Sequence, residues 1–174
     1  MVQSQRVFIA LWPPSAVRVR LAEVAADVGP RFPEGRPIRA ENLHLTLAFV
    51  GSLHVDRVIE LSAEIERFRI EPFVWTIDRL GAFNRARVLW VGGNPTPALE
   101  RLAIDVRALL DRLRVPFDRK PFAAHVTLIR DMPRTSEANA TIDPPISWPC
   151  ERPTLVRSQA GDRARQAYVL LTRT

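Results

Sequence analysis

The sequence predicts a mixed α+β protein made of two related α/β units, with the helices on the outside. The order strand, helix, loop, strand occurs twice along the 174 residues. In each unit the second strand contains a His that is followed two positions later by a Thr. Apolar runs alternate with amphipathic segments, as in proteins whose helices cover a sheet. A chain of this length buries about 70% of its unfolded surface, so we expect one domain over residues 1–174, with two pseudo-symmetric lobes.

The composition excludes several classes of protein. Cys150 is the only cysteine, which rules out an internal disulfide and a cysteine-based zinc site and is typical of a reducing compartment. No run of 18 or more apolar residues is present, and the N-terminus lacks a basic segment followed by a long apolar run. We therefore expect a cytoplasmic protein without a membrane span, and we expect a monomer.

The net charge is +6, from 25 basic and 19 acidic residues, and Lys120 is the only lysine. Arginine side chains bind phosphate through two parallel hydrogen bonds, so a polyanionic partner fits this composition. A genome composition that replaces Lys by Arg on solvated surfaces explains the same numbers equally well. Charge alone does not choose between these interpretations.

The first unit opens with an apolar run at 6–12, which indicates a buried strand that ends at two prolines. Ser15 is a suitable N-cap for a helix through about Val28, and the Gly and Pro that follow stop it. The Pro-rich segment 31–39 is expected to be a loop. It leads to the first His strand, over 42–49, which we expect Gly51 to close.

The middle of the chain predicts a helix over 56–68 and then a hairpin of strands at 73–80 and 87–91. Thr96 is expected to cap the longest helix, which runs to about Arg114. A loop over 115–121 then leads to the second His strand at 124–128.

The C-terminal part is less regular. The polar stretch 131–143 is expected to be a surface loop or a short helix. Two more strands are predicted at 147–157 and 166–172, separated by Gly161-Asp162-Arg163. Two prolines make the first of them irregular or an edge strand.

The two His strands carry the chemistry. Side chains repeat every two residues along a strand, so His44 and Thr46 share one face, and so do His125 and Thr127. Chance alone gives two such pairs from three His in about 1% of chains of this composition. The alternative is that both are ordinary strands whose His packs in the core or faces water.

If the two His faces turn toward a common groove, two imidazoles and two hydroxyls converge. An unperturbed His has a pKa of about 6.5, so one imidazole can hold a proton while the other lacks one. Such a pair suits in-line displacement at a phosphodiester, with one His as base and the other as acid. Thr46 and Thr127 can donate hydrogen bonds to the non-bridging oxygens. This scheme requires no metal and no cofactor.

These motifs resemble the paired signatures of the 2H phosphoesterases, and most closely those of the RNA 2′,3′-cyclic phosphodiesterases once named 2′-5′ RNA ligases. The motifs are His44-Leu45-Thr46-Leu47 and His125-Val126-Thr127-Leu128. The similarity also extends over 6–11, 41–51, 81–83, 87–90 and 121–122.

The resemblance implies a bilobal fold with two antiparallel sheets around a central cleft. It also implies hydrolysis of a 2′,3′-cyclic phosphate, on an RNA end or a small cyclic nucleotide, to a 2′-phosphate. By the resemblance, His44 protonates the leaving 3′ oxygen and His125 activates the water. The spacing itself does not assign acid and base. Ala124 stands where the family often has Pro, a departure that removes no chemistry.

Other residues are weaker candidates. Arg130 stands where the family commonly has a basic residue, but simple alternation puts it on the face opposite His125, so only a twist or bulge brings it into the cleft. Phe83 could stack on a base, although an aromatic residue flanked by strands is more often core. Arg119 and Lys120 could form a basic rim. The third His, His54, is expected to be an exposed residue near a helix start.

Three further interpretations remain open at this point. The same site could join RNA ends by 2′-5′ ligation, the reverse chemistry from a cyclic phosphate. The chain could instead be a non-catalytic RNA-binding module that keeps the cleft alone. A third possibility makes His44 and His125, with or without His54, ligands of a metal, as in zinc hydrolases. The tryptophans are expected in the core or on sheet faces; they are Trp12, Trp75, Trp90 and Trp148.

Overall fold

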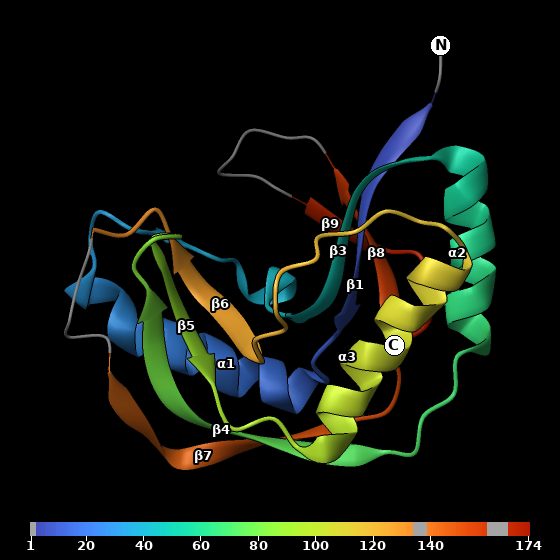
Figure 1. Ribbon diagram of the computed structural model, residues 1–174. Coiled ribbons are helices and arrows are strands. Elements are labelled where there is room, and N and C mark those ends of the chain that lie inside the picture. Colours follow the sequence, from blue (N-terminus) through green and yellow to red (C-terminus); the bar gives the residue numbers. More distant parts are fainter. Residues whose placement is uncertain (1–2, 134–138, 160–166) are drawn as a thin grey trace.

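The computed structural model describes residues 3–133, 139–159 and 167–174, and within them the strands form one antiparallel sheet (Figure 1). The strands are β1 (Ser4–Leu11), β2 (Arg36–Pro37), β3 (Leu45–His54), β4 (Phe73–Phe83), β5 (Val88–Gly92), β6 (His125–Arg130), β7 (Ala140–Cys150), β8 (Thr154–Gln159) and β9 (Ala167–Leu170). Their order is β7-β4-β5-β6-β3-β1-β8-β9, with β2 paired to β6. The predicted mixed fold of helices and strands is therefore confirmed.

The two halves of this sheet meet through a single residue pair. Leu45 of β3 pairs with Val126 of β6, whereas the other neighbouring strands pair over longer stretches. The two separate sheets expected from the resemblance are thus joined into one among the described residues. Both residues of the pair are fully buried, so the junction is part of the core.

Three α-helices are found in the described residues, α1 (Ser15–Val28), α2 (Val55–Arg67) and α3 (Pro97–Arg112), with short 3₁₀ segments at Gly29–Arg31 and Ala40–Asn42. The helix α1 contacts β7, α2 contacts β1, β3 and β8, and α3 contacts β3 and β4 (Figure 1). Each helix buries one apolar stripe, although Val19, Ile59 and Ile104 on the opposite faces are exposed. None of the described helices is long and apolar enough to span a membrane.

The helix caps follow the sequence in two of three cases. Thr96 accepts a hydrogen bond from the backbone N–H of Leu99 and caps α3, as predicted. His54 caps α2 by accepting from the N–H of Asp56 and is exposed, as expected for a residue at a helix start. The predicted cap Ser15 is wrong by one position, because Pro14 is the N-cap and Ser15 is the first helical residue.

Two strand predictions are wrong for identifiable reasons. We expected Gly51 to close the first His strand, but β3 continues to His54, and Gly51 adopts a φ of 86°, a conformation that favours glycine and accommodates a register shift opposite β1. The strand predicted at 147–157 is two strands, β7 and β8, which are separated by a break at residues 151–153. As expected from its prolines, β7 lies at the edge of the sheet.

Two predicted segments fall partly or wholly outside the described residues. The polar stretch 131–143 was expected to be a loop or short helix, but β7 already begins at Ala140, and 134–138 are not described. The predicted separator Gly161-Asp162-Arg163 lies outside the described residues. The last strand, β9, falls inside the range predicted for it.

Candidate active site

The two motif histidines meet at the junction between the sheet halves. His44 directly precedes β3, and His125 is the first residue of β6. The residues that follow them, Leu45 and Val126, form the single pair that joins the two halves. The junction therefore brings together two His that are distant in the sequence, and beside them the apolar residues Leu45, Leu47, Val126 and Leu128 are buried.

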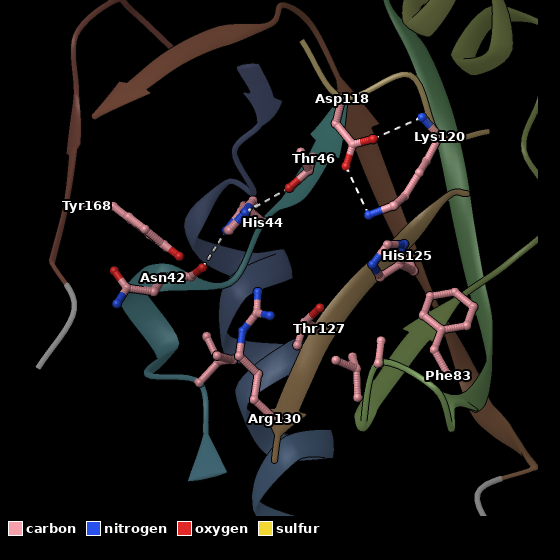
Figure 2. A pocket seen from close by; sticks show the side chains of 13 residues that line it. Asn42, His44, Thr46, Phe83, Asp118, Lys120, His125, Thr127, Arg130 and Tyr168 are labelled. Carbon is pink, nitrogen blue, oxygen red and sulfur yellow. Dashed lines mark hydrogen bonds and ion pairs between the residues drawn. The ribbon is translucent and has the colours of Figure 1, made fainter. Parts of the chain in front are cut away.

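A cavity of about 340 Å³ opens at this junction (Figure 2). All six predicted site residues line it: His44, Thr46, Phe83, His125, Thr127 and Arg130. The other lining residues are Ile38, Asn42, Ala86, Val88, Asp118, Lys120 and Tyr168. The predicted convergence of two imidazoles and two hydroxyls on a common groove is therefore present.

Both imidazoles are oriented by the same local hydrogen bond. The Nδ1 of His44 lies 2.6 Å from the carbonyl oxygen of Asn42, and the Nδ1 of His125 lies 2.7 Å from that of Ala123. Each acceptor is two residues before its His. A carbonyl oxygen can only accept, so each Nδ1 carries the proton and each Nε2 of the neutral ring has a free lone pair. For His44 that lone pair accepts from the Thr46 hydroxyl, 3.1 Å away.

Burial and nearby positive charge favour the neutral form of both rings. The pKa of His44 is lowered to about 4, chiefly by burial; the hydrogen bond to Asn42 opposes this shift and the charge of Arg130 adds to it. Burial also lowers the pKa of His125, again opposed by its backbone hydrogen bond and assisted by Arg130. In the unliganded protein both His are therefore neutral at pH 7 and able to accept a proton at Nε2.

Aromatic rings surround His44. The Trp12 ring lies parallel to the imidazole at 5.4 Å, with 3° between the planes, and Phe8 lies 4.9 Å away. Tyr168 contacts the imidazole edge-on at 5.4 Å. These rings restrict the rotation of the imidazole and exclude water from its faces, which accounts for the strongly lowered pKa of His44.

Phe83 and Trp90 provide the corresponding contacts at His125. Phe83 meets the imidazole edge-on at 5.0 Å, and Trp90 lies 5.2 Å from Phe83. Gly81 stands opposite Trp90 in the β4–β5 pairing, and a Cβ there would overlap the indole ring. Phe83 is half-buried and lines the cavity, so the alternative that it is a core residue is wrong.

A β-bulge places Arg130 in the cavity. Trp90 pairs with Thr127 and Leu89 with Ile129, so β6 has one extra residue, Leu128, between the two pairs. This extra residue shifts the alternation, and Leu128 and Ile129 are both buried while Arg130 lines the cavity. The bulge that the sequence argument required for Arg130 is therefore present.

The sequence did not single out Tyr168, Asn42 or Asp118. Tyr168 lies on β9, far from both motifs in the chain, and no local pattern marks it. Asn42 ends the short 3₁₀ segment before β3 and Asp118 lies in a loop, and polar residues are common at such places. Lys120 was named as a possible rim residue and does line the cavity, whereas Arg119 points to Asp111 in an exposed ion pair.

The third interpretation from the sequence, a metal held by the three His, does not fit the positions of these residues. His54 lies at the other end of β3 from His44 and caps α2. In the part of the chain that the structure describes, no group of three or more His, Cys, Asp or Glu side chains could hold a metal ion.

An antiparallel α/β fold with two His-x-Thr motifs facing one cavity defines a class of phosphoesterases. The family model described as LigT-like phosphoesterase matches residues 11–90. A curated relative from Escherichia coli, named RNA 2′,3′-cyclic phosphodiesterase, is 39% identical over 85% of this chain and 82% of its own length. A relative of the same name from Thermus thermophilus is 32% identical over 88% and 82%.

Solved structures agree with these relatives. The structure of E. coli LigT complexed with 3′-AMP superimposes with a TM-score of 0.87 and 32% identity, over 99% of this chain and 98% of that chain. TT0787 of T. thermophilus gives a TM-score of 0.76 and 31% identity, over 95% and 94%. The chain belongs to the LigT-like phosphoesterase family. E. coli LigT has also been solved with ATP and with NADP⁺.

Proposed function

We propose that this protein hydrolyses the 2′,3′-cyclic phosphate at RNA ends, or of small cyclic nucleotides, to a 2′-phosphate. The observation that carries the proposal is the pair of imidazoles that line one cavity, each with Nδ1 bonded to a backbone carbonyl and Nε2 available for proton transfer. The activity for which the curated relatives are named supports the same reaction.

In the proposed mechanism His125 accepts a proton from water at Nε2 as the water oxygen attacks phosphorus. The bond between phosphorus and the 3′ oxygen breaks, and His44 donates a proton to that oxygen. A 2′-phosphate and a free 3′-hydroxyl result. His44 is assigned as the acid by the family resemblance. Because the pKa of the free ring is about 4, the imidazole is neutral until the substrate binds, and it takes up its proton when the anionic phosphate is beside it.

The remaining predicted residues bind the substrate in this proposal. In the complex the Thr46 hydroxyl turns from Nε2 of His44 and, like that of Thr127, donates to the non-bridging oxygens, whose charge grows as phosphorus becomes five-coordinate. Arg130 supplies a positive charge at the same oxygens, consistent with its influence on the pKa of both His. Phe83, half-buried at the edge of the cavity, stacks on the terminal base.

We propose that the chain is a single 2H phosphoesterase domain of two pseudo-symmetric lobes joined at the pair Leu45 and Val126. One lobe is built around β4, β5, β6 and β7, and the other around β1, β3, β8 and β9. We propose that it acts as a monomer in the cytoplasm, where its one cysteine, Cys150, stays reduced and buried. Sedimentation equilibrium tests the monomer directly.

The experiment that tests the function is hydrolysis of 2′,3′-cyclic AMP, and of a short RNA with a cyclic phosphate end, in the presence of EDTA. The phosphate position in the product is resolved by ³¹P NMR. Formation of the 2′-phosphate is expected. Binding of the RNA without any product would favour the RNA-binding module instead, and a joined 2′-5′ product with a 5′-hydroxyl acceptor would indicate ligation.

A further inference from the structure

Aromatic rings continue outward from the cavity along β1 and β3. The ring of Phe8, which contacts His44, lies 6.5 Å from that of Phe49, with 13° between the planes. Phe49 is on β3, three residues beyond Thr46, and 37% of it is exposed. A continuous row of rings therefore leads from the candidate acid to a solvent-exposed phenyl face.

A guanidinium covers part of this exposed face. The Cζ of Arg6 lies 5.0 Å from the centre of the Phe49 ring. Arg6 also lies near Tyr168, which lines the cavity. Burial raises the pKa of the Tyr168 phenol, and the charge of Arg6 opposes this rise. An exposed aromatic ring with a cation beside it suits a stacked base and its phosphate, because every base has a π-face and every phosphate is anionic.

The loop that carries Lys120 is fixed next to Phe49. The backbone N–H of Asp118 donates to the carbonyl oxygen of Phe49 at 2.8 Å. The Asp118 carboxylate holds the ammonium of Lys120 at 3.2 Å, and the Lys120 side chain is 86% exposed. Exposed ion pairs of this kind are weak, so the ammonium can turn to another anion at little cost.

Two cations line the cavity among the described residues, and they lie at opposite sides of it. Figure 2 shows Arg130 at one side and the pair Asp118 and Lys120 at the other, with the two His between them. The proposed mechanism uses Arg130 for the reacting phosphate. An RNA chain has one more phosphate on the 5′ side of its terminal nucleoside, and Lys120 is placed to meet it.

We propose that Lys120, Phe49 and Arg6 form a subsite for the nucleotide that precedes the cyclic end, and that the preferred substrate is therefore an RNA end. Lys120 binds the phosphate between the last two nucleosides. The preceding base takes the place of the Arg6 guanidinium on the Phe49 ring, and Arg6 then lies beside that base. The inference rests on the proposed function, because the cyclic phosphate at the two His sets the register of the chain.

The test compares kcat/KM for a dinucleotide with a 2′,3′-cyclic phosphate end and for the matching cyclic mononucleotide. The ratio of the two is expected to fall about tenfold in Phe49→Ala and in Lys120→Gln, because loss of one stacked base or one phosphate contact is of that order. Val74→Ala, at an exposed apolar residue of β4, is the matched control for Phe49→Ala and keeps both values.

A binding measurement separates the roles of the two residues. The dissociation constant of the dinucleotide product, which carries a terminal 2′-phosphate, is measured by calorimetry as a function of salt. Lys120→Gln is expected to reduce the slope of log Kd against log salt by roughly 0.7, the value for one phosphate contact on a single strand, and Phe49→Ala leaves the slope unchanged.

The outcomes distinguish the subsite from the function. If the variants and the unsubstituted protein turn over both substrates with the same ratio of kcat/KM values, the subsite is wrong and the proposed function stands. No turnover of either substrate by the unsubstituted protein overturns the proposed function, and the subsite with it.

Discussion

At the scale of single residues, the two His are held by the same kind of hydrogen bond. In each, a backbone carbonyl two positions earlier fixes the Nδ1 proton and directs Nε2 into the cavity. The surroundings then differ, since three aromatic rings surround His44 and the pKa of that ring is lowered to about 4. Equivalent local geometry with unequal surroundings gives the two rings different proton affinities, and the bound phosphate anion has to raise the pKa of His44 before that ring acts as the acid.

Replacement of either His removes proton transfer at one side of the phosphate. His44→Ala and His125→Ala are each expected to lower kcat for cyclic AMP by about 10² to 10⁴-fold, with an unchanged circular dichroism spectrum. The matched control is His54→Ala, which removes the exposed cap of α2 and not a cavity residue. Turnover retained in both cavity variants would show that the imidazoles are not the acid and base.

The pH dependence of turnover follows from the lowered pKa values. The pH profile of kcat/KM reports the pKa values of the free enzyme. Because both His have pKa values below the ordinary value of about 6.5, both limbs of this profile are expected below pH 6.5. A bound phosphate anion favours the imidazolium, so the limbs of the kcat profile move to higher pH, by on the order of one unit. Stopped assays from pH 4 to 9 measure both profiles. Coincident profiles would contradict this account.

At the scale of elements, the bulge in β6 decides what the second motif strand can present. With regular alternation Arg130 would lie on the buried side, and one extra residue, Leu128, turns it into the cavity. The bulge depends on how β6 pairs with β5. The sequence of β6 alone therefore indicates only that Arg130 needs a bulge to reach the cavity, not that the bulge is present.

Loss of the Arg130 charge has two consequences that can be separated. Arg130→Gln is expected to lower kcat/KM about 10- to 100-fold, because hydrogen bonds to charged groups contribute about 1.5 to 3 kcal/mol. Its charge also lowers the pKa of His44 and His125, so the limbs of the kcat/KM profile move to higher pH in the variant. Arg20→Gln, at an exposed ion pair on α1, serves as the control. An unchanged pH profile would show that the Arg130 charge does not affect the pKa values of the two His.

The elements that sequence patterns predicted best are those whose pattern is local. Helical spacing, the cap Thr96 and the His-x-Thr alternation each depend on neighbours within a few residues. The features that sequence patterns missed depend on partners distant in the chain. Gly51 ends no strand because β1 pairs beyond it, and Tyr168 reaches the cavity only because β9 pairs with β8. Such pairings leave no periodic signal in one strand.

At the scale of the whole molecule, the candidate site lies where the sheet is narrowest. A single pair, Leu45 with Val126, connects the halves, and the two His flank it. The cavity is lined by residues beside that pair, and β3 and β6 run apart beyond it (Figure 1). Residues from β3, β6 and β9 therefore line the same cavity, and each half of the sheet supplies one of the two imidazoles.

Burying two titratable rings at this junction makes the stability of the fold depend on pH. The folded pKa of His44 is about 4 and the unfolded value about 6.5, so above pH 6.5 both states are neutral and there is no effect. As the pH falls from 6.5 to 4 the unfolded chain binds the proton first, which reduces the free energy of unfolding by about 3 kcal/mol for this ring. Below pH 4 both states are protonated and the loss is complete.

His44→Gln is expected to remove most of this loss while the carboxylates titrate as before. The free energy of unfolding in urea, measured at pH 7.5 and at pH 4.5, should therefore fall less in His44→Gln than in the unsubstituted protein, by about 1 to 3 kcal/mol. His54→Gln is the control, since this residue is exposed at the start of α2. An equal loss in all three proteins would mean that His44 titrates normally in the fold, and that its surrounding rings do not exclude the charged form.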